Sequence, residues 1–463
     1  MRCKMRIEKD FLGTLEIPTD VYYGIQTVRA KENFPITGQR CDEYLICALA
    51  IVKKAAAYAN FQTNQLDEKI ATSIMQAADE IVAGKWFDQF IVDPIQGGAG
   101  TSLNMNMNEV IANRTLELLG YNKGDYQKIS PNSHVNMSQS TNDAFPTAIH
   151  IATITLLDQL LTVMEGMIDT FKEKSKQFDK VIKMGRTHLQ DAVPIRLGQE
   201  FAAYAKVIER DYNRISQAKE HLYEINIGAT AIGTCLNANA EYIEIVTEAI
   251  ARFTKQPFIQ CDNYIDGTQN TDFYTEVSST LKITMLNLSK ICNDLRLMAS
   301  GPKAGLAEIL LPERQPGSSI MPGKVNPVML EVINQIAFQV VGNDTTICMA
   351  SEAGQFELNV MEPVLVHNLL QSIRIMTNGF EAFTEYCLKD IKANEELMKQ
   401  YVDRSIGIVT AIAPYVGYEM ASKIAREALT TNMTVRELCL KYEVLTEEQI
   451  NTILNPYRMT SLS

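Results

Sequence analysis

Hydrophobic residues recur at steps of three or four over several very long stretches of the chain. One stretch follows Asn142 and Asp143, which can cap a helix, and continues for nearly thirty residues with Pro146 near its first turn. This spacing places apolar side chains on one face of a helix. The apolar positions of four such stripes are Ile151, Ile154, Leu157, Leu161, Met164, Ile168 and Phe171; Phe201, Ala205, Ile208, Tyr212, Ile215 and Leu222; Val277, Leu281, Thr284, Leu288, Ile291, Leu295 and Met298; and Leu369, Ile373, Met376, Phe380, Phe383 and Cys387. A further helix is predicted to begin after Pro327.

Helices of this length must bury their apolar stripes against one another. At about 1.5 Å per residue they reach roughly 40 Å, and five of them cover each other as a bundle. The pattern predicts a mainly α protein with three domains: residues 1–141 mixed and mostly helical, 142–395 a central five-helix bundle, and 396–463 a small helical domain. Two capping-box sequences, Thr434 to Glu437 and Thr446 to Gln449, predict short helices in the last domain.

Composition narrows the class of protein. The 463 residues carry a formal net charge of −12 without a basic run, which argues against a nucleic-acid partner. No uninterrupted apolar run approaches the roughly 20 residues of a membrane span, and the first ten residues lack a targeting signal. Nine scattered cysteines without a Cys-x-x-Cys pair or a Cys/His cluster predict reduced thiols in a cytoplasmic protein and no zinc site.

Residues 317–327, Gly-Ser-Ser-Ile-Met-Pro-Gly-Lys-Val-Asn-Pro, form the stretch that packing explains least. Two glycines and two prolines exclude a regular helix or strand, so the segment is predicted to be a loop. It carries a possible proton acceptor, further donors and a cation: Ser318, Ser319, Lys324 and Asn326. The alternative is an ordinary turn before a helix start. A phosphate-binding loop is excluded by its spacing, because five residues rather than four separate the glycines and valine replaces the magnesium-binding Ser or Thr.

Three other segments collect polar residues in a similar way. Residues 97–102 read as a glycine-rich loop that presents Thr101, residues 138–143 place Ser140, Thr141 and Asn142 at the start of the first long helix, and residues 185–191 contain Thr187 and His188. A helix N-terminus favours an anion. Each segment alone is more often a cap or a loop, and a lone histidine is more often structural than catalytic.

Taken together, these segments offer many donors, one cation and a flexible serine-rich loop, a set that suits a small dicarboxylate. They offer no thiol nucleophile, metal-ligand spacing or Ser-His-Asp signature. An elimination reaction needs only a base, donors that stabilise the negative charge, and a site for the leaving group. Removal of a proton beside a carboxylate sends negative charge into an enediolate, which prearranged donors stabilise. A serine base would need its pKa lowered, for which Lys324 and the loop amides are available.

The blocks at 138–143, 185–194 and 317–327 resemble, in order and spacing, the signature segments of the fumarase/aspartase superfamily. Within it the chain resembles the aspartate ammonia-lyases more than the class II fumarate hydratases. The segments that favour this assignment are Arg6 to Gly13, Tyr22 to Gly24, Glu32 to Ile36, Val135 to Asp143 and Phe356 to Pro363. Fumarases typically have Ser-Ser-Asn-Asp where this chain has Ser140-Thr141-Asn142-Asp143.

The resemblance implies a homotetramer in which the central bundles form a twenty-helix core. It also implies active sites that each combine segments from three subunits, so that a monomer would be inactive. The reaction implied is the reversible deamination of L-aspartate to fumarate and ammonia. It implies no organic cofactor, and we predict no required metal because the sequence shows no ligand cluster.

The resemblance also implies a role for each matched residue. Ser318 would remove the Cβ proton, with the loop closing over the substrate on Gly317 and Gly323. Thr101, Ser140, Thr141 and Ser319 would hold the β-carboxylate, Thr187, Lys324 and Asn326 would bind the α-carboxylate, and Asn142 and His188 would lie near the amino group. The alternatives are a fumarate hydratase acting on L-malate, more distantly the argininosuccinate and adenylosuccinate lyases that share the loop, and, from another class, a non-catalytic scaffold like the lens proteins of this superfamily.

Overall fold

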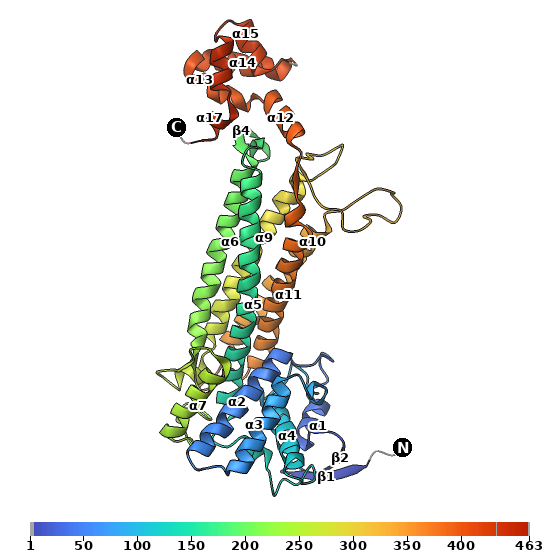
Figure 1. The fold of residues 1–463 in the computed structure, drawn as a ribbon, viewed down its shortest axis with the longest axis vertical. Helices are drawn as coiled ribbons and strands as arrows, with labels where there is room; N and C mark the ends of the chain where they lie inside the picture. Colours follow the sequence, from blue (N-terminus) through green and yellow to red (C-terminus); the bar gives the residue numbers. More distant parts are fainter. Residues whose placement is uncertain (1–3, 432, 462–463) are drawn as a thin grey trace. The chain divides into compact units, whose positions relative to one another are not determined.

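The computed structural model describes residues 4–431 and 433–461. The protein is mainly helical, as predicted, and its short strands form two-stranded sheets. The chain has five long helices, which Figure 1 labels α5, α6, α9, α10 and α11; α5, α6, α9 and α11 carry the four predicted apolar stripes, and α10 begins after Pro327 as predicted. α5 has 37 residues and is longer than predicted. The helix bounds are Thr141–Gln177, Leu197–Glu220, Asp272–Met298, Val328–Glu352 and Glu362–Tyr386.

Tertiary contacts divide the chain into two compact units. Unit 1 comprises Met1–Leu161, Asn213–Ile283 and Phe338–Thr377, and unit 2 comprises Thr162–Tyr212, Thr284–Ala337 and Asn378–Ser463. Each long helix contributes residues to both units. The domain boundaries predicted after residues 141 and 395 stay a prediction.

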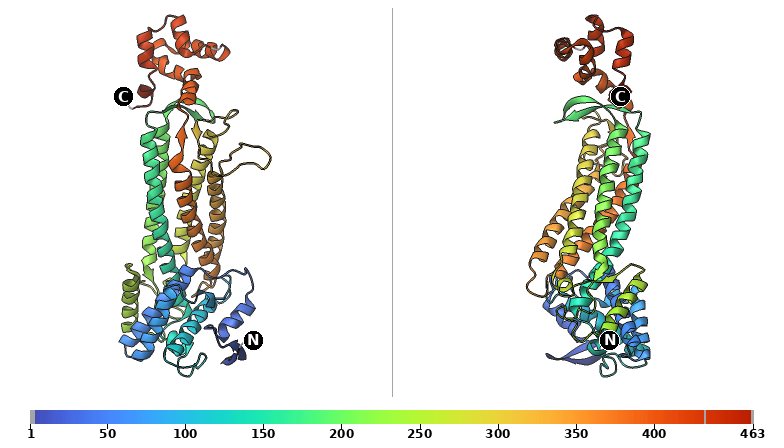
Figure 2. Two further views of the ribbon diagram at one scale, coloured as in Figure 1. Left: turned by 45° about the vertical axis from the view of Figure 1, so that its right-hand side comes forward. Right: turned by 90° about the vertical axis from the view of Figure 1, so that its left-hand side faces the viewer.

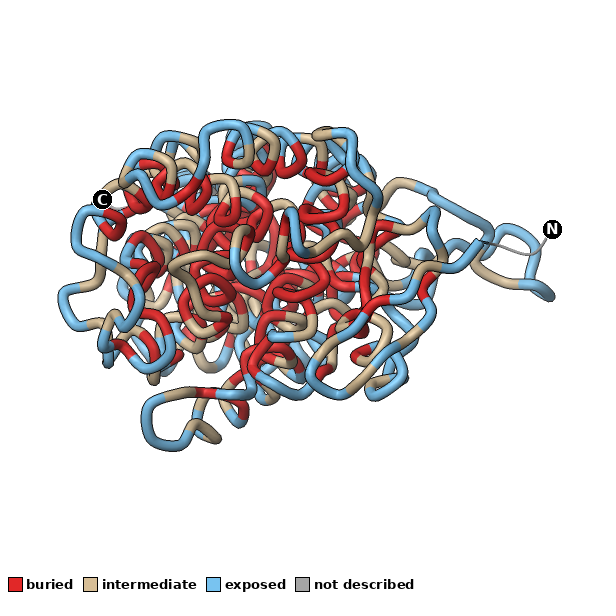
Figure 3. Tube along the Cα trace, turned by 90° about the horizontal axis from the view of Figure 1, so that it is seen from below, coloured by how far each residue is buried: buried red, intermediate tan, exposed pale blue. Residues whose placement is uncertain are grey.

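Unit 1 adds a hairpin and a set of shorter helices to the long ones. Buried and exposed turns alternate along its helices, which Figure 3 shows in red and pale blue. The hairpin consists of β1 (Met5–Asp10) and β2 (Gly13–Pro18), and a short parallel pair joins β5 (Glu224–Ile225) to β6 (Ile259–Gln260). The helices are α1 (Ile25–Asn33), α2 (Glu43–Gln62), α3 (Glu68–Val82), α4 (Thr101–Leu118), α7 (Ala240–Thr254) and α8 (Asp266–Gln269), with single turns at η1 (Phe87–Gln89), η2 (Pro131–Val135) and η3 (His221–Tyr223).

α4 is a buried helix that is unusually rich in polar side chains. Buried amides normally find hydrogen-bond partners, and those of α4 bind the backbone of neighbouring loops. Asn106 donates to the carbonyl of Gln89 at 3.0 Å, and Asn113 donates to the carbonyl of Tyr22 at 2.7 Å and accepts from the amide of Gly124 at 2.8 Å. The helix therefore fixes several loops of unit 1 in place.

Glu109 of α4 caps a different helix, α1. The first N–H groups of a helix lack partners within the helix, and Gly24 at the N-cap of α1 has no side chain to supply one. Glu109 accepts instead from the amides of Gly24, Gln26 and Thr27 at 2.8 to 3.1 Å and from the Thr27 hydroxyl at 2.6 Å. Glu8 of β1 accepts from the Ile25 amide at 2.8 Å. A Cβ at Gly24 would lie 2.6 Å from the Glu8 carboxylate, so only glycine fits there.

This arrangement gives a structural reason for two of the segments that favoured the family assignment. Arg6 pairs with Glu8 at 2.8 Å and donates to the carbonyls of Pro18, Val21 and Tyr23 at 2.7 to 2.9 Å. The segments around Arg6 and Gly24 thus tie the β1–β2 hairpin to the start of α1.

Unit 2 contains a second hairpin and the C-terminal helices. The hairpin pairs β3 (Ile182–Thr187) with β4 (Gln190–Arg196), and β7 (Ile309–Leu310) pairs with β8 (Lys392–Ala393). Thr434 and Thr446 both form the predicted capping boxes. The helices are α12 (Glu395–Arg404), α13 (Val409–Val416), α14 (Tyr418–Thr430), α15 (Val435–Lys441), α16 (Glu447–Ile453) and α17 (Pro456–Met459), with single turns at η4 (Leu388–Asp390) and η5 (Ile406–Ile408).

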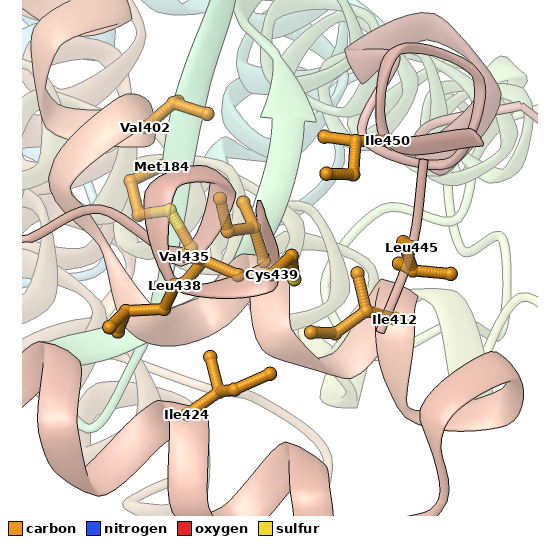
Figure 4. Close-up of a cluster of buried hydrophobic side chains, with 10 residues drawn as sticks. Met184, Val402, Ile412, Ile424, Val435, Leu438, Cys439, Leu445 and Ile450 are labelled. Atoms are coloured by element: carbon orange, nitrogen blue, oxygen red, sulfur yellow. The ribbon is translucent and has the colours of Figure 1, made fainter. Parts of the chain in front are cut away.

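Two apolar clusters hold unit 2 together. Along the long helices, the ring centroid of Phe171 lies 6.3 Å from those of Phe201 and Phe383. The other cluster lies among the C-terminal helices and includes Met184 of β3, which anchors the hairpin there (Figure 4). Its buried members are Met184, Val402, Ile408, Ile412, Ile424, Val435, Leu438, Cys439, Leu445 and Ile450.

Three further observations concern membranes, thiols and metals. α2 and α5 are long and apolar enough to cross a membrane by length and composition, but 67% and 61% of their apolar windows are buried inside the protein, as in a core helix. The eight cysteines within the described ranges are free thiols, and Cys3 lies outside those ranges. In residues 4–431 and 433–461, no group of three or more His, Cys, Asp or Glu side chains could hold a metal ion.

Candidate active site

Thr101 opens α4 at the end of the glycine-rich loop, as the sequence predicts. Gly98 and Gly100 both have a φ of +89°, which is costly for other residues. A Cβ at Gly100 would lie 2.6 Å from the ring of Phe145, so the backbone approaches that ring too closely for any side chain. Thr101 is exposed and lines a hollow of about 350 Å³, together with residues of α1 and the β1–β2 turn.

Ser140 and Thr141 stand at the start of α5, where both hydroxyl oxygens act as acceptors. Ser140 Oγ accepts from the amide of Asn142 at 3.2 Å, and Thr141 Oγ1 accepts from Nδ2 of Asn104 at 3.1 Å. An oxygen that already accepts a hydrogen bond leaves its own proton to donate. The two hydroxyls are therefore arranged as donors beside a helix N-terminus, which suits an anion.

The cap of α5 differs slightly from the prediction. The helix begins at Thr141, so Asn142 lies in its first turn rather than at the cap. Asp143 accepts from the Ser140 amide at 2.9 Å and completes the cap. The side chain of Asn142 donates to the carbonyl of Ala231 at 2.8 Å, which ties the start of α5 to the segment after β5.

Thr187 and His188 lie at the tip of the β3–β4 hairpin. Thr187 pairs with Gln190, so His188 and Leu189 form a two-residue turn with φ angles of +55° and +61°. Such turns normally use Asn and Gly, and side chains held in this region carry a conformational cost that is common at functional sites. Both turn residues are exposed. The sequence did not reveal this hairpin, because residues 182–196 lack regular alternation and a standard turn sequence.

Ionic contacts within unit 2 hold this hairpin rigidly. Arg186 donates to the fully buried carboxylate of Glu308 at 2.8 Å, and Lys183 lies 3.5 Å from the same carboxylate. Ser405 donates to Asp191 at 2.8 Å on the other strand. Glu308 directly precedes β7, from which the serine-rich loop departs, so two ion pairs connect the hairpin to the base of that loop.

The predicted loop, residues 317–327, is part of a longer loop of residues 311–327 between β7 and α10, and Figure 2 shows this longer loop standing away from the neighbouring helices. Its 317–326 portion is closed at the base by two hydrogen bonds. The amide of Gly317 donates to the carbonyl of Lys324, and Nδ2 of Asn326 donates to the carbonyl of Gly317, both at 2.7 Å. A Cβ at Gly317 would lie 2.8 Å from the Asn326 amide nitrogen, and Gly323 has a φ of +81°. Both glycines are thus required by the shape of the loop.

The hydroxyl of Ser318 receives two backbone donors from its own loop. The amides of Ile320 and Met321 donate to Ser318 Oγ at 3.2 and 3.1 Å. Hydrogen bonds to an oxygen favour its charged form, so this geometry lowers the cost of removing the serine proton. The sequence indicated that loop amides were available for this purpose, and two of them lie at the hydroxyl.

The other polar residues of the loop are accessible to a ligand. Ser319 and Lys324 are exposed, and Asn326 is half-buried. Lys324 has no carboxylate partner within the part of the chain that the structure describes. With Asn326 it lines a hollow of about 610 Å³ beside β7 and the end of α9.

The predicted site residues therefore fall into two groups. Group A, in unit 1, contains Thr101, Ser140, Thr141 and Asn142. Group B, in unit 2, contains Thr187, His188, Ser318, Ser319, Lys324 and Asn326. Within each group, segments that are distant in sequence are joined by hydrogen bonds or ion pairs.

Comparison with known proteins covers nearly the whole chain. Residues 13–342 match the family described as Lyase, and residues 408–461 match the fumarase C C-terminus. The chain belongs to this lyase family. Over 455 residues the lyase is 68% identical to an aspartate ammonia-lyase of Bacillus subtilis, and the match covers 98% of this chain and 96% of that protein. It is 51% identical to that of Helicobacter pylori and 46% identical to that of Escherichia coli, each over at least 98% of this chain and 96% of theirs.

Solved structures share the lyase's fold. A fumarate lyase:delta crystallin from Brucella melitensis, solved bound to cobalt, has a TM-score of 0.97 at 45% identity, and the match covers 99% of this chain and 100% of that one. A class II fumarase from Schistosoma mansoni has a TM-score of 0.94 at 32% identity, with 98% of this chain and 99% of that one covered. These relatives establish the fold of the lyase over its full length.

Sequence reasoning missed the buried polar residues behind group A. Lys53 is fully buried on α2, and Asp143, recognised only as a cap, accepts from the amides of Gly228 and Thr230 at 3.0 Å. The available signal was a lysine and an asparagine, Lys53 and Asn60, within the otherwise apolar buried face of α2. Such residues in an apolar stripe indicate either a partner in the core or a site.

Proposed function

We propose that this lyase is an aspartate ammonia-lyase, which converts L-aspartate reversibly to fumarate and ammonia. The observation that carries the proposal is the identity of 46% to 68%, over almost the entire length, to proteins named for that activity in several bacteria. The similarity to a class II fumarase is lower, at 32%. The hydroxyl of Ser318, with two amides directed at it, supplies the base that such an elimination needs.

The proposed reaction proceeds in two steps. Ser318 Oγ, as the alkoxide, takes a proton from Cβ of aspartate, and the electron pair of that C–H bond moves into the β-carboxylate to give an enediolate. The electron pair then returns to form the C=C bond, the C–N bond breaks, and ammonia leaves with the electrons of that bond. Fumarate remains, and the serine proton passes to ammonia or to solvent. Donors that face the enediolate stabilise the charge at the moment it develops.

The two groups of residues divide the substrate between them. In group A, Thr101, Ser140 and Thr141 would bind the β-carboxylate with Ser319 from group B, and their hydroxyls have protons free to donate. Lys324, Thr187 and Asn326 would bind the α-carboxylate, for which the lysine supplies a positive charge. Asn142 and His188 would lie near the leaving amino group.

We further propose a homotetramer whose active sites combine segments from three subunits. α10 supports this assembly, because its exposed face lacks charge over five turns. Between residues 332 and 350 the only charged side chain is Asp344, which is 3% exposed and bonded to Ser278. Phe338 and Met349 on the same helix are each 69% exposed. An uncharged face of this length on a soluble protein is typical of a surface covered by another subunit.

The remaining parts of the proposal concern location and cofactors. A cytoplasmic location agrees with the free thiols in the described part of the chain. The chemistry above needs no organic cofactor, since base, charge and donors all come from side chains and backbone.

The direct test measures fumarate by its ultraviolet absorbance. Purified protein is mixed with L-aspartate in one cuvette and with L-malate in another, without added metal. We expect fumarate from aspartate and at least about 100-fold less from malate, because the group near the leaving nitrogen decides the substrate. Fumarate from malate alone would make the protein a hydratase, and no product from either would favour the non-catalytic scaffold.

A further inference from the structure

A buried lysine lies behind group A without an ion-pair partner. Lys53 of α2 is 0% exposed, and in residues 4–431 and 433–461 no carboxylate pairs with it. Its ammonium donates only to neutral amide oxygens: Oδ1 of Asn136 at 3.0 Å and Oε1 of Gln139 at 2.9 Å. Burying a charge without an opposite charge in contact is expensive, so its retention here calls for a reason.

The amides that hold Lys53 lead directly to the hydroxyls of group A. Oδ1 of Asn136 also accepts from Nδ2 of Asn104 at 3.2 Å, and the same Nδ2 donates to Thr141 Oγ1 at 3.1 Å. Two amide side chains thus connect the ammonium to Thr141. Gln139, the other partner of Lys53, directly precedes Ser140.

The carboxylate whose charge acts on Lys53, that of Asp143, is already satisfied by other partners. Its carboxylate accepts from the amides of Ser140, Gly228 and Thr230 at 2.9 to 3.0 Å. Burial lowers the pKa of Lys53 to about 7, and the charge of Asp143 only partly opposes that shift. A ligand's negative charge next to the Thr141 hydroxyl would therefore stabilise the ammonium, and by linkage the ammonium would stabilise that charge.

We propose that Lys53 is a positioning residue whose buried charge, transmitted through Asn136, Asn104 and Thr141, stabilises the enediolate more than the bound substrate. The inference rests on the proposed function, because it takes Thr141 as a ligand of the β-carboxylate. The extra negative charge of the enediolate forms only after the proton has been removed. A fixed cation stabilises that charge strongly because the dielectric constant of the buried site is low. Lys53 therefore acts on the rate rather than on the ground-state affinity.

The test replaces Lys53 with Met, which has a similar length and no charge. Calorimetry measures the binding of succinate, which resembles the substrate, and of the nitronate of 3-nitropropionate, which carries its charge where the enediolate does. We expect nitronate affinity to fall by about 100-fold and succinate affinity by less than about 3-fold, with a matching fall in kcat at nearly constant KM. An equal loss of affinity for both ligands would overturn the proposal, because a lysine with a merely structural role would affect the binding of both alike.

The adjacent lysine provides a matched control. Lys54 is only partly buried, pairs with Asp79 at 2.6 Å and lies over the ring of Phe253, so Lys54→Met should leave both affinities within about 2-fold of wild type. If Lys53→Met does not fold, Asn104→Ala tests the same path with Lys53 in place. This variant removes the Nδ2 donor to Asn136 and Thr141, and no other hydrogen bond is lost with Oδ1 because Oδ1 has no partner. Asn104→Ala should weaken the binding of the nitronate about 10-fold more than the binding of succinate. An unchanged ratio of the two affinities would overturn the proposal. The two affinities are measured without any turnover of substrate. The proposed function is tested separately, by the formation of fumarate with the wild-type protein.

Discussion

Replacing Ser318 with Ala should lower kcat for L-aspartate by about 1,000-fold while succinate still binds with nearly wild-type affinity. A general base contributes on the order of 10² to 10⁴ in rate, and the Ser318 oxygen is the group that two loop amides hold ready for deprotonation. The measurement is fumarate formation under saturating aspartate, with calorimetry for succinate. Binding should survive because the carboxylate ligands remain in place.

Ser319→Ala is the matched control for this experiment. Ser319 is exposed and is proposed to bind a carboxylate rather than to take a proton. Its loss removes one of several donors to the β-carboxylate and should lower kcat/KM by roughly 10-fold, which is the usual effect of losing one hydrogen bond to a charged group. A Ser318→Ala protein that kept a tenth of wild-type kcat would show that another group removes the proton.

Replacing Glu109 with Ala should destabilise the protein more than any other single change considered above. The carboxylate accepts three backbone N–H groups and one hydroxyl, and the alanine variant would leave these donors buried without partners. Each such loss costs about 1 to 3 kcal/mol, so the free energy of unfolding should fall by at least about 3 kcal/mol. Burial raises the pKa of Glu109 to about 7, and the hydrogen bonds from Thr27, Gln26 and Gly24 oppose that shift. Chemical denaturation followed by circular dichroism measures the change.

A second acidic residue of α4 serves as the control for that prediction. Glu117 accepts from the Tyr22 hydroxyl and from Arg114, but it is exposed, and exposed pairs contribute less than about 1 kcal/mol. Glu117→Ala should therefore shift the unfolding midpoint only slightly. Equal losses from the two variants would contradict the assignment of Glu109 as the cap of α1.

Four of the long helices, α5, α6, α9 and α11, could be predicted from their apolar stripes, and α10 begins directly after Pro327 as predicted. The 317–327 loop was equally predictable, since glycine and proline leave little choice of structure. The β3–β4 hairpin was not, because its turn residues, His188 and Leu189, adopt left-handed conformations that the sequence does not signal.

The environment of the site was less accessible to sequence analysis than its residues. The hydrogen bonds that join Asn104 and Asn136 to Thr141 and Lys53 depend on how α2, α4 and the start of α5 pack. Burial of Lys53 and Glu109 likewise follows from packing.

Each active site of the proposed tetramer should take group A from one subunit and Ser318 from another. Co-expression of Thr141→Val, which removes one donor to the enediolate and should lower kcat by about 100-fold, with Ser318→Ala, expected to lower kcat by about 1,000-fold, and with a different tag on each chain allows hybrid tetramers to be isolated. In a random mixture, a site is intact when its group A comes from the Ser318→Ala chain and its serine from the Thr141→Val chain. Such sites make up about a quarter of the total, so hybrids should regain about a quarter of wild-type kcat. Hybrid tetramers without activity would contradict the shared site.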